Sequence, residues 1–169
     1  MPAGLKATSA NIAIGFSVPE SAPNTFTQGS TDLNLSPLDR EVFVVLAVNL
    51  DASFPDIVAP LATNVRAGLT TTSQTSVPNL SDSNCLARIT EAIEHDGIAA
   101  VSFSTSAGET PPATLEYIGI IATNDFFIQV QGTNNVTSKG VSGKLYGYRA
   151  RVTDAGIYAA LVQSEVLSA

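Results

Sequence analysis

Hydrophobic and polar residues alternate over several short stretches of the chain, as they do in strands with one buried face. Near the N-terminus the alternation places Ile12, Ile14, Phe16 and Val18 on one face of an extended segment. A continuous apolar run, EVFVVLAVNLD at residues 41–51, predicts a central strand that is buried on both faces. Further strands are predicted at residues 69–77, 97–104, 114–123, 125–132 and 143–152.

From Ser81 onward the pattern changes to a helical one. Apolar residues recur at helical spacing at Leu86, Ile89, Ala92 and Ile93. Ser81, Asp82 or Ser83 can cap the start of a helix, and Gly97 can end it. This spacing predicts a helix over residues 81–97.

The tail at residues 154–167 fits two interpretations. Thr153 or Asp154 can cap a short helix that buries Ile157, Ala160, Leu161 and Val166. A last strand is also compatible with the sequence, because Ile157, Ala159 and Leu161 alternate. The sequence leaves both alternatives open.

Six to eight strands with no regular βαβ alternation predict a mainly β fold. We expect an antiparallel β-sandwich of jelly-roll or Greek-key type, with one or two short helices. Residues 1–37 hold few charges and too little apolar content for a core, so they predict an extended arm before a sandwich domain at residues 38–169. The arm is expected to make intersubunit contacts through Ile12, Ile14, Phe16 and Val18.

Charge narrows the range of functions. Only 14% of the 169 residues are charged and the formal net charge is −7, so the phosphate backbone of a nucleic acid would be repelled on average. We therefore expect no direct nucleic-acid contact. The apolar run at residues 42–48 is far shorter than the roughly 20 residues of a transmembrane helix, so no membrane span is expected.

The densest group of ionisable residues is TEAIEHDG at residues 90–97, which contains the only histidine, His95. On a helix Glu91 and His95 are neighbours, and this arrangement is typical of a solvated helix end. Zinc needs more nitrogen or sulfur ligands than His95 and the single cysteine, Cys85, supply. Cys85 and His95 are ten positions apart, which is too far along one helix for a nucleophile and base pair.

Other polar groups also suggest no assembled site. Asn49, Asp51 and Asp56 offer oxygen ligands near a strand end, but without a recognised calcium spacing. Tyr146 and Tyr148 share one strand face, which is the pattern of a core face. We therefore expect no catalytic residues, no cofactor and no metal, and no enzyme.

A low-charge arm and a body of short strands with Thr-rich and Asn-rich loops resemble the small structural proteins of virus particles. The likeness includes SANIAIGFSVPESAPNTFTQGS, VFVVLAVNL, FFIQVQGTNN and KLYGYRARV, and it covers the whole chain without a diagnostic motif. The resemblance implies a virion protein, a capsid, vertex or cement subunit, whose partners are copies of itself and other shell proteins. The alternative is a secreted or surface carbohydrate-binding β-sandwich module.

Overall fold

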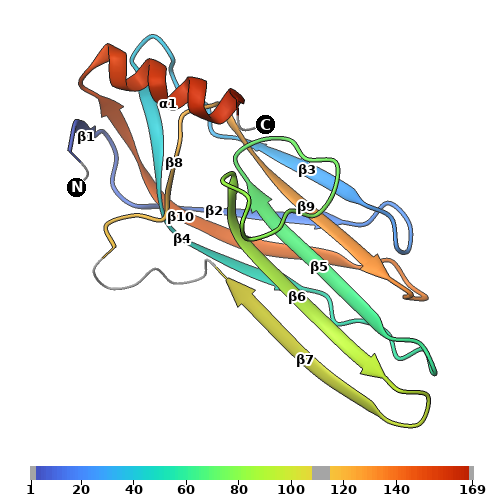
Figure 1. Ribbon diagram of the computed structural model, residues 1–169. Coiled ribbons are helices and arrows are strands. Elements are labelled where there is room, and N and C mark those ends of the chain that lie inside the picture. Colours follow the sequence, from blue (N-terminus) through green and yellow to red (C-terminus); the bar gives the residue numbers. More distant parts are fainter. Residues whose placement is uncertain (1–2, 108–114, 168–169) are drawn as a thin grey trace.

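The computed structural model describes residues 3–107 and 115–167, which form two antiparallel sheets and one helix (Figure 1). Sheet A contains β1 (Leu5–Ala7), β2 (Ile12–Pro19), β4 (Glu41–Ala52), β8 (Gly119–Ile121) and β10 (Gly140–Val152). Sheet B contains β3 (Thr27–Asp32), β5 (Thr63–Thr70), β6 (Cys85–His95), β7 (Ala100–Ala107) and β9 (Asp125–Thr133). Helix α1 spans Ala155–Leu167. The fold is therefore mainly β, an antiparallel sandwich, as the sequence predicts.

In sheet A the order is β1-β10-β4-β8, and β2 also pairs with β10, beyond the end of β1. The pairing of β10 with β4 shifts register between Tyr146 and Gly147. In sheet B the order is β3-β9-β5-β6-β7. Every one of these neighbouring pairs is antiparallel.

The main core lies between the sheets and follows from the alternation along each strand. Inward residues of β4 such as Phe43, Val45 and Val48 are fully buried and meet Leu69 of β5 and Phe126 of β9. In the first half of β4 the outward residues Val42 and Val44 are buried as well. β4 is therefore the central buried strand that the sequence predicts.

Helix α1 covers the outward face of sheet A at one end of the sandwich. Val42 and Val44 of β4 lie there in a second apolar cluster with Ala150 of β10, and Tyr158 and Leu161 of the helix pack against them. The Asp154 carboxylate accepts a 2.7 Å hydrogen bond from the Gly156 amide, which caps the helix start. The open choice for residues 154–167 is thus resolved in favour of a helix. The side chain of Val166 lies outside the described residues. Within the described residues, no helix is long and apolar enough to cross a membrane.

The predicted helix at residues 81–97 is wrong, because most of this segment is strand β6. Inward positions Ala87, Ile89 and Ile93 are buried at strand spacing, and a register shift opposite Leu69 and Thr70 lets Leu86 pack against the core as well. The bulge thus brings Leu86 and Ile89, which are three residues apart, to the same core, while Ala92 is buried on the opposite face of the strand. Pairing with β5 on one side and β7 on the other overrides the local helical pattern.

The predicted strand at residues 69–77 is also largely wrong. Of these residues only Leu69 and Thr70 are in a strand, where they form the end of β5. β5 begins at Thr63, in a stretch that the sequence pattern does not predict as a strand. Residues beyond Thr70 turn back over the outward face of sheet B, where the Gln74 amide donates a 2.8 Å hydrogen bond to the side chain of Gln28. Pro78 covers Gly68 so closely that an added Cβ would meet it at 2.9 Å.

The segment of residues 1–37 contributes strands to both sheets. β1 and β2 pair with β10, and β3 pairs with β9. Val18 belongs to the buried core, and Ile14 and Phe16 pack against it. The Phe16 ring meets the Phe126 ring edge to face, with centroids 5.9 Å apart.

Candidate protein-contact surface

The segment around His95 forms a hairpin turn between β6 and β7. The His95 Nδ1 accepts a 2.8 Å hydrogen bond from the Gly97 amide. The Asp96 carboxylate accepts hydrogen bonds from the amides of Ile98 and Ala99 at 2.8 and 2.7 Å, and these bonds lower the pKa of Asp96. Gly97 has φ +98°, which favours glycine at this turn. The polar groups of residues 95–97 therefore organise a turn.

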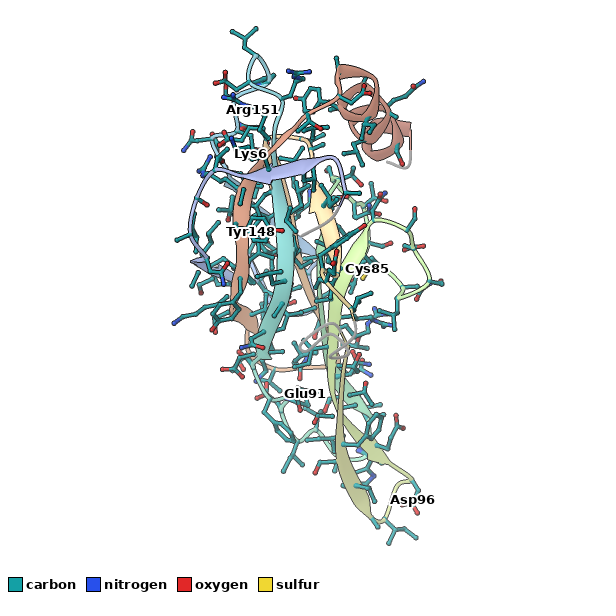
Figure 2. The ribbon with its side chains drawn as sticks, turned by 90° about the vertical axis from the view of Figure 1, so that its left-hand side faces the viewer. Lys6, Cys85, Glu91, Asp96, Tyr148 and Arg151 are labelled. Atoms are coloured by element: carbon teal, nitrogen blue, oxygen red, sulfur yellow. The ribbon has the colours of Figure 1, made fainter. Side chains whose placement is uncertain are left out.

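Strand β6 holds the remaining ionisable groups of this region apart (Figure 2). Cys85 lies at the opposite end of β6 from His95, and burial raises the pKa of its thiol. Glu91 lies between them, and its pKa is raised by burial and then by the negative charge of Asp51. A surface hollow of about 380 Å³ includes Asp51 among the residues that line it, but not Glu91.

The tyrosines of β10 share one face, as predicted, but this is the outward face of sheet A and not the face of the main core. Tyr148 packs into the apolar cluster beneath α1. Burial raises the pKa of Tyr148, and the negative charge of Glu116 raises it further. Tyr146 is half-buried and borders a second shallow hollow of about 350 Å³. Arg149 is 3.5 Å from Glu41 in an ion pair.

The most extensively bonded polar cluster lies at the other end of the sandwich, where three loops meet: residues 20–26, 53–62 and 134–139. Glu20 is 5% exposed, although it is a carboxylate. It accepts hydrogen bonds from the amides of Thr25, Gly132 and Lys139 at 3.0, 3.0 and 2.7 Å. These bonds provide the polar partners that a buried carboxylate requires.

Asp56 joins the β4–β5 loop to the β9–β10 loop. Its carboxylate accepts from the amides of Val136 and Thr137, from the Thr137 hydroxyl, and from the Lys139 ammonium at 2.7 Å. The Lys139 hydrogen bond is the largest of the effects that hold the pKa of Asp56 far below its usual range. The carboxylate that we considered as a calcium ligand is thus already paired with an ammonium group.

Asn135 completes this network from a nearly buried position. Its side chain accepts from the Asp56 amide and donates to the Asn64 carbonyl, each at 2.9 Å. Its backbone forms two hydrogen bonds with the side chain of Asn24, at 2.8 and 2.9 Å. The three loops are therefore held to one another by side chains that are almost completely bonded, so the surface they carry is preorganised.

Large apolar side chains project from this bonded end. Ile57 is 77% exposed and Val136 is 70% exposed, and they flank the contact between Asp56 and the β9–β10 loop. Phe54 is 52% exposed and Leu61 is 48% exposed on the same β4–β5 loop. We call these four residues the loop-end patch. Apolar side chains held outward by a rigid polar base are typical of surfaces that contact another protein.

The residues expected at the arm interface lie mainly against this chain's own core. Val18 is 8% exposed, and Ile12, Ile14 and Phe16 are partly buried on the same face of β2. Their contact with a neighbouring subunit stays a prediction. Sequence reasoning missed the loop-end patch, because its polar base joins residues that are up to 119 positions apart.

No protein-family model matches the chain. The search of curated proteins also found no match. Among solved structures, the chain is similar to one titled turnip yellow mosaic virus, with 12% identity over 92% of this chain and 89% of the other, and a TM-score of 0.34. It is also similar to one titled Desmodium yellow mottle tymovirus, with 9% identity over 92% of this chain and 96% of the other, and a TM-score of 0.33. Both titles name viruses.

Proposed function

We propose that the protein is a structural subunit of a virus particle, acting through self-association and contacts with other shell proteins, without catalysis and without direct contact with the genome. The observation that carries this proposal is the loop-end patch, which presents four large apolar side chains on a base of interlocked loops. Capsid, vertex and cement roles all require such contact surfaces. The low proportion of charged residues is consistent with a surface that is partly covered by protein.

The strand order supports a jelly-roll architecture, which is common in viral shells. β2-β10-β4-β8 in one sheet faces β3-β9-β5-β6 in the other, giving two four-stranded antiparallel sheets. We propose that these eight strands form the jelly roll, with β1 and β7 as additions at its edges. The arm residues Ile12, Ile14, Phe16 and Val18 then act first as part of this sandwich, and residues 1–37 contact a neighbour through their exposed side.

The test replaces two residues of the loop-end patch by a small polar residue, in the double variant Ile57→Ser and Val136→Ser. Both side chains are exposed, so the fold should be retained. Loss of two buried apolar contacts at an interface is worth on the order of 1–3 kcal/mol, so self-association measured by sedimentation velocity should weaken about fivefold or more. Circular dichroism checks the fold of each variant.

Leu38→Ser is the matched control, since Leu38 is 97% exposed in the β3–β4 loop at the opposite end of the sandwich. It should leave association unchanged. Equal association of the patch variant and the native chain would contradict the proposed use of this surface. Saturable binding on a glycan array, lost in the patch variant, would instead favour the carbohydrate-binding alternative.

A further inference from the structure

Strand β7 is the outermost strand of sheet B. It pairs with β6 along its whole length, from Arg88 opposite Ala107 to His95 opposite Ala100. On its other side it pairs with no strand of residues 3–107 and 115–167. A row of backbone amide and carbonyl groups along that side is therefore open to pairing.

Both faces of β7 are also exposed over residues 100–105. All side chains of residues 100–105 are exposed, whichever face of the sheet they lie on. Val101 is 67% exposed and Phe103 is 43% exposed, and Ile98 at the adjoining turn is 95% exposed. The β6–β7 hairpin extends away from sheet A at one end of the molecule (Figure 1), and Figure 2 shows Asp96 at its tip.

The sequence of β7, AVSFSTSA, has none of the features by which proteins protect an edge strand. It contains no charged residue and no proline, and its pairing with β6 runs without a register shift. The other edges differ: β1 and β8 are only three residues long, β3 ends at Asp32, and β2 ends at Pro19 with its inward face in the core. β7 is thus the described edge best suited to accept another strand.

We infer that β7 pairs antiparallel with β7 of a second copy of this chain, so that sheet B continues across a twofold axis. This inference rests on the proposed self-association and names a surface for it. Charge argues for a second copy: the chain has a net charge of −7, yet two β7 strands can meet without opposing any like charges. With the axis at Phe103, each Phe103 lies opposite its symmetry mate, and Ser102 lies opposite Ser104.

The pairing of one strand with its copy buries less than the 1,200–2,000 Å² that is typical of a stable interface. The isolated contact is therefore weak, and other contacts in a shell, including those of the loop-end patch, add to it. Weak individual contacts that are repeated around a closed assembly together give a stable particle.

The test places like charges on the open edge in the double variant Ser102→Lys and Ser104→Lys. Both serines are exposed, so the monomer should fold, and each lysine would lie opposite a lysine of the other copy. Self-association measured by sedimentation velocity should weaken at least about tenfold. The control, Ser76→Lys with Ser142→Lys, makes the same charge change at exposed positions away from β7 and should associate like the native chain.

A charge swap tests direct pairing of the two strands. The variant Ser102→Glu and Ser104→Glu should also fail to associate alone, but an equimolar mixture with the lysine variant should form heterodimers, since lysine then faces glutamate. Native-like association of the lysine variant, or a mixture that stays monomeric, would overturn the inference while the proposed function stood. A native chain that never associates would overturn both.

Discussion

Replacement of Phe16 by alanine tests whether β2 is an integral strand or a loosely attached arm. The Phe16 ring packs on the core and meets the Phe126 ring edge to face at 5.9 Å. A fully buried phenylalanine costs about 3–5 kcal/mol when it is truncated to alanine, and Phe16 is only partly buried. About half of that cost, together with a loss of about 0.5–1 kcal/mol for the ring pair, predicts a destabilisation of about 2–3 kcal/mol.

Urea denaturation followed by circular dichroism measures this change. With a slope of about 2 kcal/mol per molar urea, the midpoint should fall by about 1 M while the slope stays the same. Ser17→Ala is the matched control, because Ser17 is exposed on the opposite face of the same strand, and it should change stability by less than about 0.5 kcal/mol. If Phe16→Ala costs no more than this control, β2 is not docked in solution and our account of the core is wrong.

Three further substitutions test particular contacts. Gly143→Ala should cost more than about 3 kcal/mol or prevent folding, because a Cβ there would collide with a backbone carbonyl of β4. Gly15→Ala is the control, because its Cβ would meet nothing closer than 4.0 Å, and it should keep native stability in thermal denaturation. Glu91→Gln should raise the melting temperature at pH 7, because the pKa of the Glu91 carboxyl in the folded state is raised above 4.5 and its charged form therefore opposes folding. This gain in melting temperature should vanish as the pH falls through the folded-state pKa of Glu91. Asp56→Asn should lower the melting temperature at pH 7, because the pKa of the Asp56 carboxyl in the folded state is depressed below 3.8 and the carboxylate therefore stabilises the fold above that pH. A loss of melting temperature that is the same well below pH 3.8 as at pH 7 would contradict this.

The sequence predicts the strands whose alternation is regular and whose length is typical. β9 and β10 are predicted within a few residues, because apolar and polar residues alternate along much of each strand. β4 is predicted from its continuous apolar run, which reflects burial between sheet B on one face and α1 on the other. These patterns are local, and they are enough to indicate a β-sandwich.

Strands β5 and β6 could not be predicted in the same way. In β5 the inward residues Val65, Ala67 and Leu69 alternate with Arg66 and Gly68, a weak pattern that follows a proline-rich loop. In β6 the bulge brings Leu86 and Ile89 to the core at helical spacing, and Ala92 is buried on the other face. Both strands are specified by their neighbours in sheet B, and that information is not present in a short window of sequence.

The candidate contact surface was even less accessible to sequence reasoning. Exposure of Ile57 and Val136 depends on loops that are fixed by Glu20, Asp56 and Asn135, which come from three distant parts of the chain. Hydrophobic residues in loops give no signal by themselves that they will be exposed. The β7 edge is different, since an uncharged strand without proline is visible in the sequence, but only the sheet order shows that it is outermost.

The central claim is that this protein acts by associating with copies of itself. Multi-angle light scattering of the native chain over a series of increasing concentrations tests it most directly, because the average mass is measured without assuming a shape. The account predicts a mass that rises from that of one chain toward dimers and larger assemblies, and that falls back when the loop-end patch or β7 is altered. A mass that stays at that of a single chain at every concentration would contradict it.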